Sequence, residues 1–85
     1  PPLVFLEEFT QGSLARWRAA GRNLERFSHD LLFALEAHRA KYSAELIDAA
    51  RSATTTRFEA LGIDASSSMR GLTAHEFVLR RESSF

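Results

Sequence analysis

A mainly apolar repeat with spacings of three and four residues runs without a gap from Leu14 to Tyr42. One face of an α-helix recurs at this spacing, because side chains at i, i+3, i+4 and i+7 lie above one another. The repeat keeps its phase through Gly21, a residue type that often marks a turn. Its members are Leu14, Trp17, Gly21, Leu24, Ser28, Leu31, Leu35, His38 and Tyr42. An all-α fold is therefore expected.

The repeat predicts one long amphipathic helix over about residues 13–61. Gly12 followed by Ser13 indicates its start, since Ser is a favoured N-cap residue. Gly62 indicates its end, because Gly adopts the left-handed conformation that closes a helix and the apolar Ile63 follows to pack back. A helix of this length would span ~73 Å at 1.5 Å per residue.

A break near Gly21 is the alternative, with Asn23 as the N-cap of a second helix. A glycine inside a helix costs ~1 kcal/mol relative to alanine, which makes the continuous and the broken helix close in free energy. The broken version corresponds to a monomeric three-helix bundle.

Short elements are expected on both sides of the long helix within a single domain, residues 1–85. A short helix is predicted over 3–11 and a linker over 62–72. A last short helix is predicted over 73–82, because Thr73-Ala74-His75-Glu76 has the pattern of a capping box.

Composition excludes several classes of protein. Lys plus Arg and Asp plus Glu both number 11, so a main role in neutralising nucleic-acid phosphates is not expected. No apolar run approaches the ~20 residues of a transmembrane helix. The chain has no Cys, which excludes disulfides and thiolate zinc sites and fits a reducing compartment such as the cytoplasm.

No motif in the chain requires a reaction. Neither a glycine-rich phosphate loop nor a recognisable metal or nucleotide motif is present, and the three His residues are scattered. We therefore expect a chain that is not an enzyme and that binds no cofactor or metal. A small structural subunit of an enzyme complex is one further alternative.

A second apolar stripe lies elsewhere on the predicted helix. Its members are Phe33, Ala37, Ala40, Ala44, Ile47 and Phe58. A helix that is apolar on two faces is typical of the interior of a bundle. The chain has too few other helical residues to cover both faces, which predicts a homo-oligomer or a partner-protein helix in a bundle or coiled-coil-like assembly. The expected function is thus that of a dimerisation or docking domain that forms part of a larger protein or complex.

The first stripe supplies the predicted interface anchors. Trp17 and Phe27 bury large areas, and His38 is expected to be buried and hydrogen-bonded, with a pH-sensitive contact as the alternative. The full set of predicted interface residues is Leu14, Trp17, Leu24, Phe27, Leu31, Leu35, His38, Tyr42 and Leu46.

The stretch from Trp17 to Phe27, with the Ala-rich stretch from Ala37 to Leu46, resembles phasin-type proteins. These are small helical bacterial proteins that coat polyester storage granules. The resemblance covers residues 14–61 and rests on composition and periodicity rather than on a motif. It implies an alternative function in which the apolar stripe coats a granule or a lipid surface.

Overall fold

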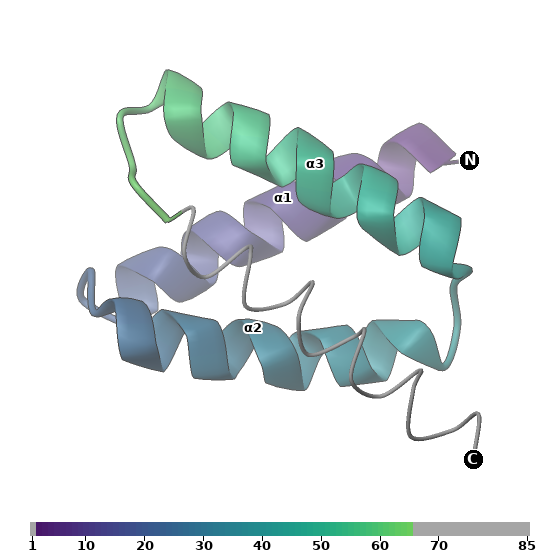
Figure 1. Cartoon of the computed structure of the whole chain (residues 1–85), viewed down its shortest axis with the longest axis horizontal. Coiled ribbons are helices and arrows are strands. Elements are labelled where there is room, and N and C mark those ends of the chain that lie inside the picture. The colour runs from purple at the N-terminus through teal and green to yellow at the C-terminus, as the bar shows by residue number, and fades with distance from the viewer. Residues whose placement is uncertain (1, 66–85) are drawn as a thin grey trace, which may run out of the picture.

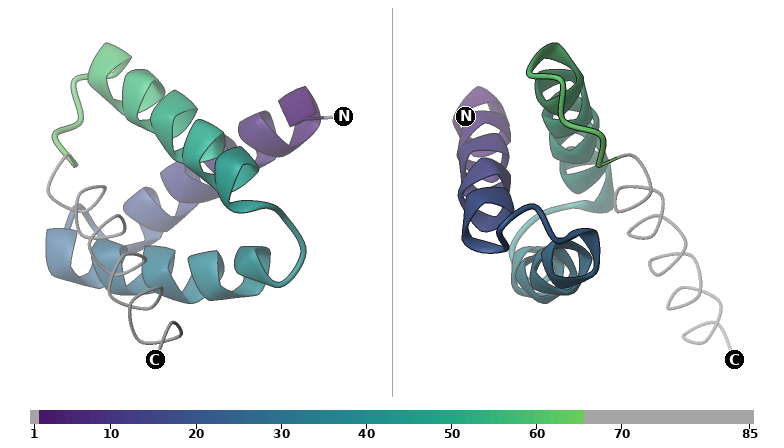
Figure 2. Two further views of the ribbon diagram at one scale, coloured as in Figure 1. Left: turned by 45° about the vertical axis from the view of Figure 1, so that its right-hand side comes forward. Right: turned by 90° about the vertical axis from the view of Figure 1, so that its left-hand side faces the viewer.

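The computed structural model describes residues 2–65, and these form three α-helices (Figure 1). The helices are α1 (Pro2–Ala19), α2 (Leu24–Arg39) and α3 (Ala44–Ala60). α1 packs most extensively against α3, and the two cross over one another in the left view of Figure 2. In the right view, α2 is seen end-on beneath the other two helices. The all-α prediction is confirmed for this part of the chain.

The predicted long helix over 13–61 is wrong, because the chain breaks at Gly21. This residue has φ 61° and is followed by Arg22 with φ 65°, so two successive residues are left-handed. The Gly21 N–H donates to the carbonyl of Arg18 (3.1 Å) and the Arg22 N–H to that of Trp17 (3.4 Å). These are the two bonds of a Schellman motif, which ends α1. The three helices have similar lengths of 18, 16 and 17 residues.

The alternative start of a second helix at Asn23 is confirmed. Its side-chain oxygen accepts a hydrogen bond from the Arg26 N–H at 3.0 Å, as an N-cap residue does. The predicted break over Gly12 and Ser13 is wrong, because α1 continues through both residues. The buried Ser13 hydroxyl donates to the Phe9 carbonyl one turn earlier (2.8 Å) and is satisfied inside the helix.

A second break, between α2 and α3, was not predicted. The Tyr42 N–H donates to the His38 carbonyl (2.9 Å), and Ser43 then accepts from the Leu46 N–H (3.2 Å) as the N-cap of α3. Ser43 followed by Glu45 in the first turn was a readable start signal. The repeat concealed it, because the four-residue step from His38 to Tyr42 stays in phase across the turn.

The predicted end of the last described helix is confirmed. Gly62 has φ 72° and donates to Glu59, and the Ile63 N–H donates to the Phe58 carbonyl at 2.9 Å. Ile63 packs back against the core, as the motif requires. Residues 62–65 follow the helix, whereas the rest of the predicted linker and the predicted helix over 73–82 lie outside the described residues.

The core contains two groups of aromatic rings. Near the turn between α1 and α2, Phe27 contacts both Trp17 (centroids 5.2 Å apart) and Phe58 (5.7 Å), and these two rings are 6.5 Å from each other. At the other end of α2, Phe5 and Phe9 of α1 lie against His38, at 5.4 and 5.6 Å. The first group joins all three helices, and the second joins the N-terminal half of α1 to the end of α2.

A buried hydroxyl pair marks the crossing of α1 and α3. The Oγ1 atoms of Thr10 and Thr54 are 3.0 Å apart. Each hydroxyl also lies within hydrogen-bond distance of the carbonyl oxygen four residues earlier in its own helix, that of Leu6 for Thr10 (2.9 Å) and that of Ala50 for Thr54 (2.8 Å). An ion pair between Glu7 and Arg57 (3.2 Å) lies at the exposed edge of the same crossing.

Alanine substitutions at Gly12, inside α1, and at Gly21, in the turn that follows α1, should change the stability of the fold in opposite directions. Gly21→Ala is expected to destabilise the fold by about 1 kcal/mol, because φ 61° is unfavourable for a residue with a Cβ atom. Gly12→Ala is expected to stabilise it by roughly 0.5–1 kcal/mol through helix propensity. A Cβ atom at Gly12 meets only the movable end of the Arg16 side chain.

Thermal unfolding of the two variants measures both effects. A midpoint raised by Gly21→Ala would contradict the broken helix, and a midpoint lowered by Gly12→Ala would contradict the continuity of α1.

Candidate interaction surface

The outer side of α2 carries an apolar strip. Phe33 is 79% exposed, Ala37 is exposed one turn further on, and the exposed C-cap residue Ala40 follows in helical conformation at the end of α2. The inward side of the same helix buries Phe27, Leu31, Ala34 and Leu35. At 3.6 residues per turn, Phe33 points away from this buried face, since it lies about 200° around the helix from both Leu31 and Leu35. We refer to Phe33, Ala37 and Ala40 as the outer strip.

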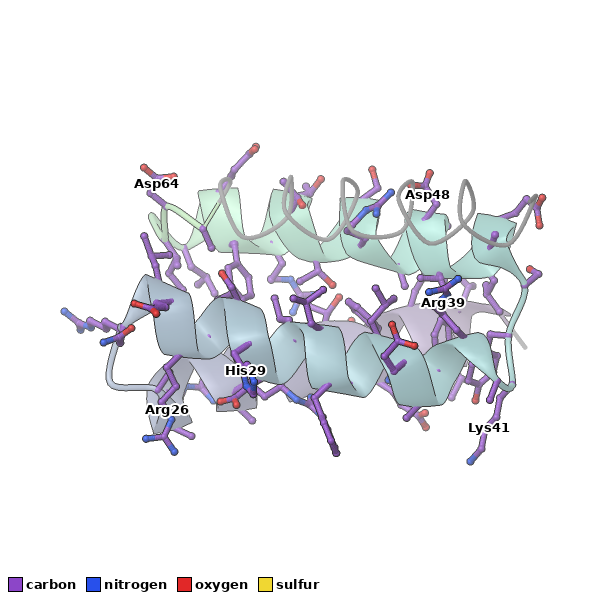
Figure 3. All side chains as sticks on the ribbon, turned by 60° about the horizontal axis from the view of Figure 1, so that its bottom comes forward. Arg26, His29, Arg39, Lys41, Asp48 and Asp64 are labelled. Atoms are coloured by element: carbon purple, nitrogen blue, oxygen red, sulfur yellow. The ribbon has the colours of Figure 1, made fainter. Side chains whose placement is uncertain are left out.

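Charged side chains of both signs surround the outer strip. Arg26 and Asp30 form an ion pair at 3.9 Å, and Glu36 pairs with Arg39 at 3.5 Å. In Figure 3, Arg26 and His29 point away from α3, whereas Arg39 lies on the side of α2 that faces it. A shallow hollow of ≈ 520 Å³ lies at the start of the helix among Asn23, Glu25, Arg26, His29 and Asp30. An apolar centre with a mixed-charge rim is the usual composition of a protein interface.

A groove of ≈ 690 Å³ lies where the end of α1 meets the end of α3. Leu14, Trp17, Arg18 and Arg22 line one side, and residues 61–64 line the other. Trp17 also meets Phe27 edge to face, so its main contact is with the core. The groove combines an aromatic surface with two guanidinium groups, but it presents no converging set of catalytic groups among its lining residues.

The predicted interface residues are divided between the core and the surface. Leu14, Phe27, Leu31 and Leu35 are buried in the chain's own core. Trp17, His38 and Leu46 are partly buried, and Leu24 and Tyr42 are 40% and 36% exposed. Their contact with a partner stays a prediction. Phe33 was not among them, although its place in the second stripe was a signal for it.

His38 is partly buried in the aromatic group at the end of α2. Its ring contacts Phe5, Phe9 and Tyr42. Burial lowers the pKa of His38, and the positive charges of Arg16 and Lys41 lower it further. The neutral imidazole is therefore the form that the fold favours.

Stability should fall when His38 is protonated. His38 binds a proton less tightly in the folded chain than in the unfolded chain. The free energy of unfolding that neutral His38 contributes is therefore present above the ordinary His pKa of about 6.5 and is lost as pH falls below it. His38→Phe keeps a ring in the aromatic group and removes the titration. Urea unfolding between pH 7 and 5 should show a shallower loss for this variant, and equal losses for both proteins would contradict this role of His38.

The described residues offer no site for a metal ion. Within residues 2–65, no three His, Cys, Asp or Glu side chains lie close enough together to hold one. None of α1, α2 and α3 is long and apolar enough to cross a bilayer.

Comparisons with known proteins add no relative. The chain matches no protein-family model, no curated protein and no solved structure.

Proposed function

We propose that this chain is a non-catalytic helical association module that binds a helix of another protein chain through the outer strip of α2. The exposure of Phe33 carries this proposal. A single exposed apolar side chain is ordinary on a protein surface. Phe33 differs because Ala37 and Ala40 continue its face at i+4 and i+7, the spacing by which one helix contacts another.

The rim of the strip supports the same function. Arg26, Asp30 and Glu36 flank the apolar centre. More than half of the Arg26 and Glu36 side-chain surface is exposed, and 38% of that of Asp30. Charges in this position select a partner and its orientation more than they add affinity. The small Ala side chains permit a close approach of a second helix backbone.

Capture from an extract of the source cells tests this function. We expect a partner that is retained by the wild-type chain and by Leu3→Gln but lost with Phe33→Gln. Leu3 is the matched control, because it is equally exposed at 79% but lies on α1. If neither a second copy nor any retained protein depends on Phe33, the proposed function is wrong.

The granule-coating alternative stays a prediction without a supporting observation in the described helices. A coat would use the first stripe, and Leu14, Leu31 and Leu35 of that stripe are turned into the core. A structural subunit of an enzyme complex would use the same outer strip, with a catalytic chain as the partner. A cytoplasmic location stays our expectation from the Cys-free sequence.

A further inference from the structure

We infer that the partner of the outer strip is a second copy of this chain, paired antiparallel along α2. In this dimer, Phe33 of each copy packs against Ala37 and Ala40 of the other. The inference rests on the proposed function and names its partner.

The sizes of the side chains favour the antiparallel direction. The strip is large at Phe33 and small at Ala37 and Ala40, which lie about 6 and 10 Å further along the helix axis at 1.5 Å per residue. A two-fold axis between positions 33 and 37 places each ring over the small residues of the partner copy. A parallel pair would set ring against ring and alanine against alanine, which leaves a gap between the helices.

The charges favour the same direction. Asp30 lies one turn before Phe33, and Lys41 follows Ala40 at the other end of the strip. The antiparallel pair brings Asp30 of each copy beside Lys41 of the other, so the contact occurs twice. In a parallel pair the two-fold axis would run along the helices, so the two Asp30 side chains would lie on opposite flanks of the contact and neither would meet Lys41. Within each copy, Asp30 also pairs with Arg26 at 3.9 Å, and 38% of its side chain stays exposed to reach a second cation.

Charge balance favours a self-pair over a strongly acidic or basic partner. Around the strip, Arg26, Arg39 and Lys41 oppose Asp30 and Glu36, and the whole chain has a formal net charge of zero. A face with Asp30 before the strip and Lys41 after it brings these two opposite charges together in its own reversed copy. One helix pair buries less than the ~1,200 Å² of a standard interface, so the dimer should be weak and concentration-dependent.

Sedimentation equilibrium over a wide concentration range tests the dimer. We expect self-association of the wild-type chain, a dissociation constant raised at least ~10-fold by Phe33→Gln, and no change with Leu3→Gln. Circular dichroism of each variant verifies that the helices are kept. A folded Phe33→Gln variant that still dimerises like the wild type would overturn the inference.

A charge swap tests the direction. At low ionic strength, Asp30→Lys and Lys41→Glu should each weaken the dimer about two- to tenfold, and the double variant should recover most of the loss. A double variant that associates no more tightly than the single variants would overturn the antiparallel pairing, because Asp30 and Lys41 would then not be in contact.

The failure of this inference differs from that of the proposed function. A wild-type chain that stays monomeric at every concentration overturns the self-pair. The proposed function fails only if the capture experiment also yields no protein that depends on Phe33.

Discussion

Leu31→Asp is expected to unfold the chain. Leu31 is 1% exposed in the core between the helices, where a carboxylate would lose its hydration without gaining an ion-pair partner. The cost is several kcal/mol, comparable with the ~5–15 kcal/mol by which a small domain is stable. Far-UV circular dichroism at 25 °C should show most of the helical signal lost.

Phe33→Asp is the matched control, since it places the same side chain two residues along on the exposed side of α2. This variant should keep the helical signal and a cooperative thermal transition. A cooperatively folded Leu31→Asp chain would show that Leu31 does not lie in the core. Because Leu31 belongs to this core, its substitution tests folding and is unsuitable as a test of association.

Phe27→Ala should cost about 3–5 kcal/mol, the usual range for truncating a fully buried ring. Phe27 is 0% exposed and joins α2 to both other helices through Trp17 and Phe58. The surrounding rings cannot close the space, because each is held by its own helix. Urea unfolding measures the loss, and the single Trp of the chain reports it by fluorescence.

Leu24→Ala serves as the comparison, because Leu24 lies on the same helix but is 40% exposed. We expect a loss of about 1 kcal/mol or less for this variant. If Phe27→Ala shifted the urea midpoint no further than Leu24→Ala, the ring group at this end of the domain would not be a main source of stability.

Local signals were readable in the sequence. Asn23 caps the start of α2 and Gly62 ends α3, as their residue types predict. Both roles depend only on local chemistry, a side-chain oxygen in one case and a left-handed φ in the other. The all-α class was equally readable, since spacings of three and four residues fit only a helix. Glycine alone was ambiguous, because an interior helix position and a left-handed stop both accept it.

The division of the repeat into separate helices was decided by tertiary structure. Consecutive helices turn their apolar faces toward one shared core, so the stripes of neighbouring helices join into one pattern in the sequence. The turns at Gly21 and Ser43 happen to preserve the phase of that pattern. Its period therefore could not distinguish one long helix from three short ones.

Which residues of the second stripe are buried was also decided only by the packing of the helices. Ile47 and Phe58 on α3 are buried, whereas Phe33 and Ala37 on α2 are exposed. By itself, the sequence determined that these residues share a helical spacing. Which of them faces the core depends on the turn between α2 and α3, because this turn sets the direction of α3 relative to α2. The candidate interaction surface is the part of the stripe that this turn leaves outside.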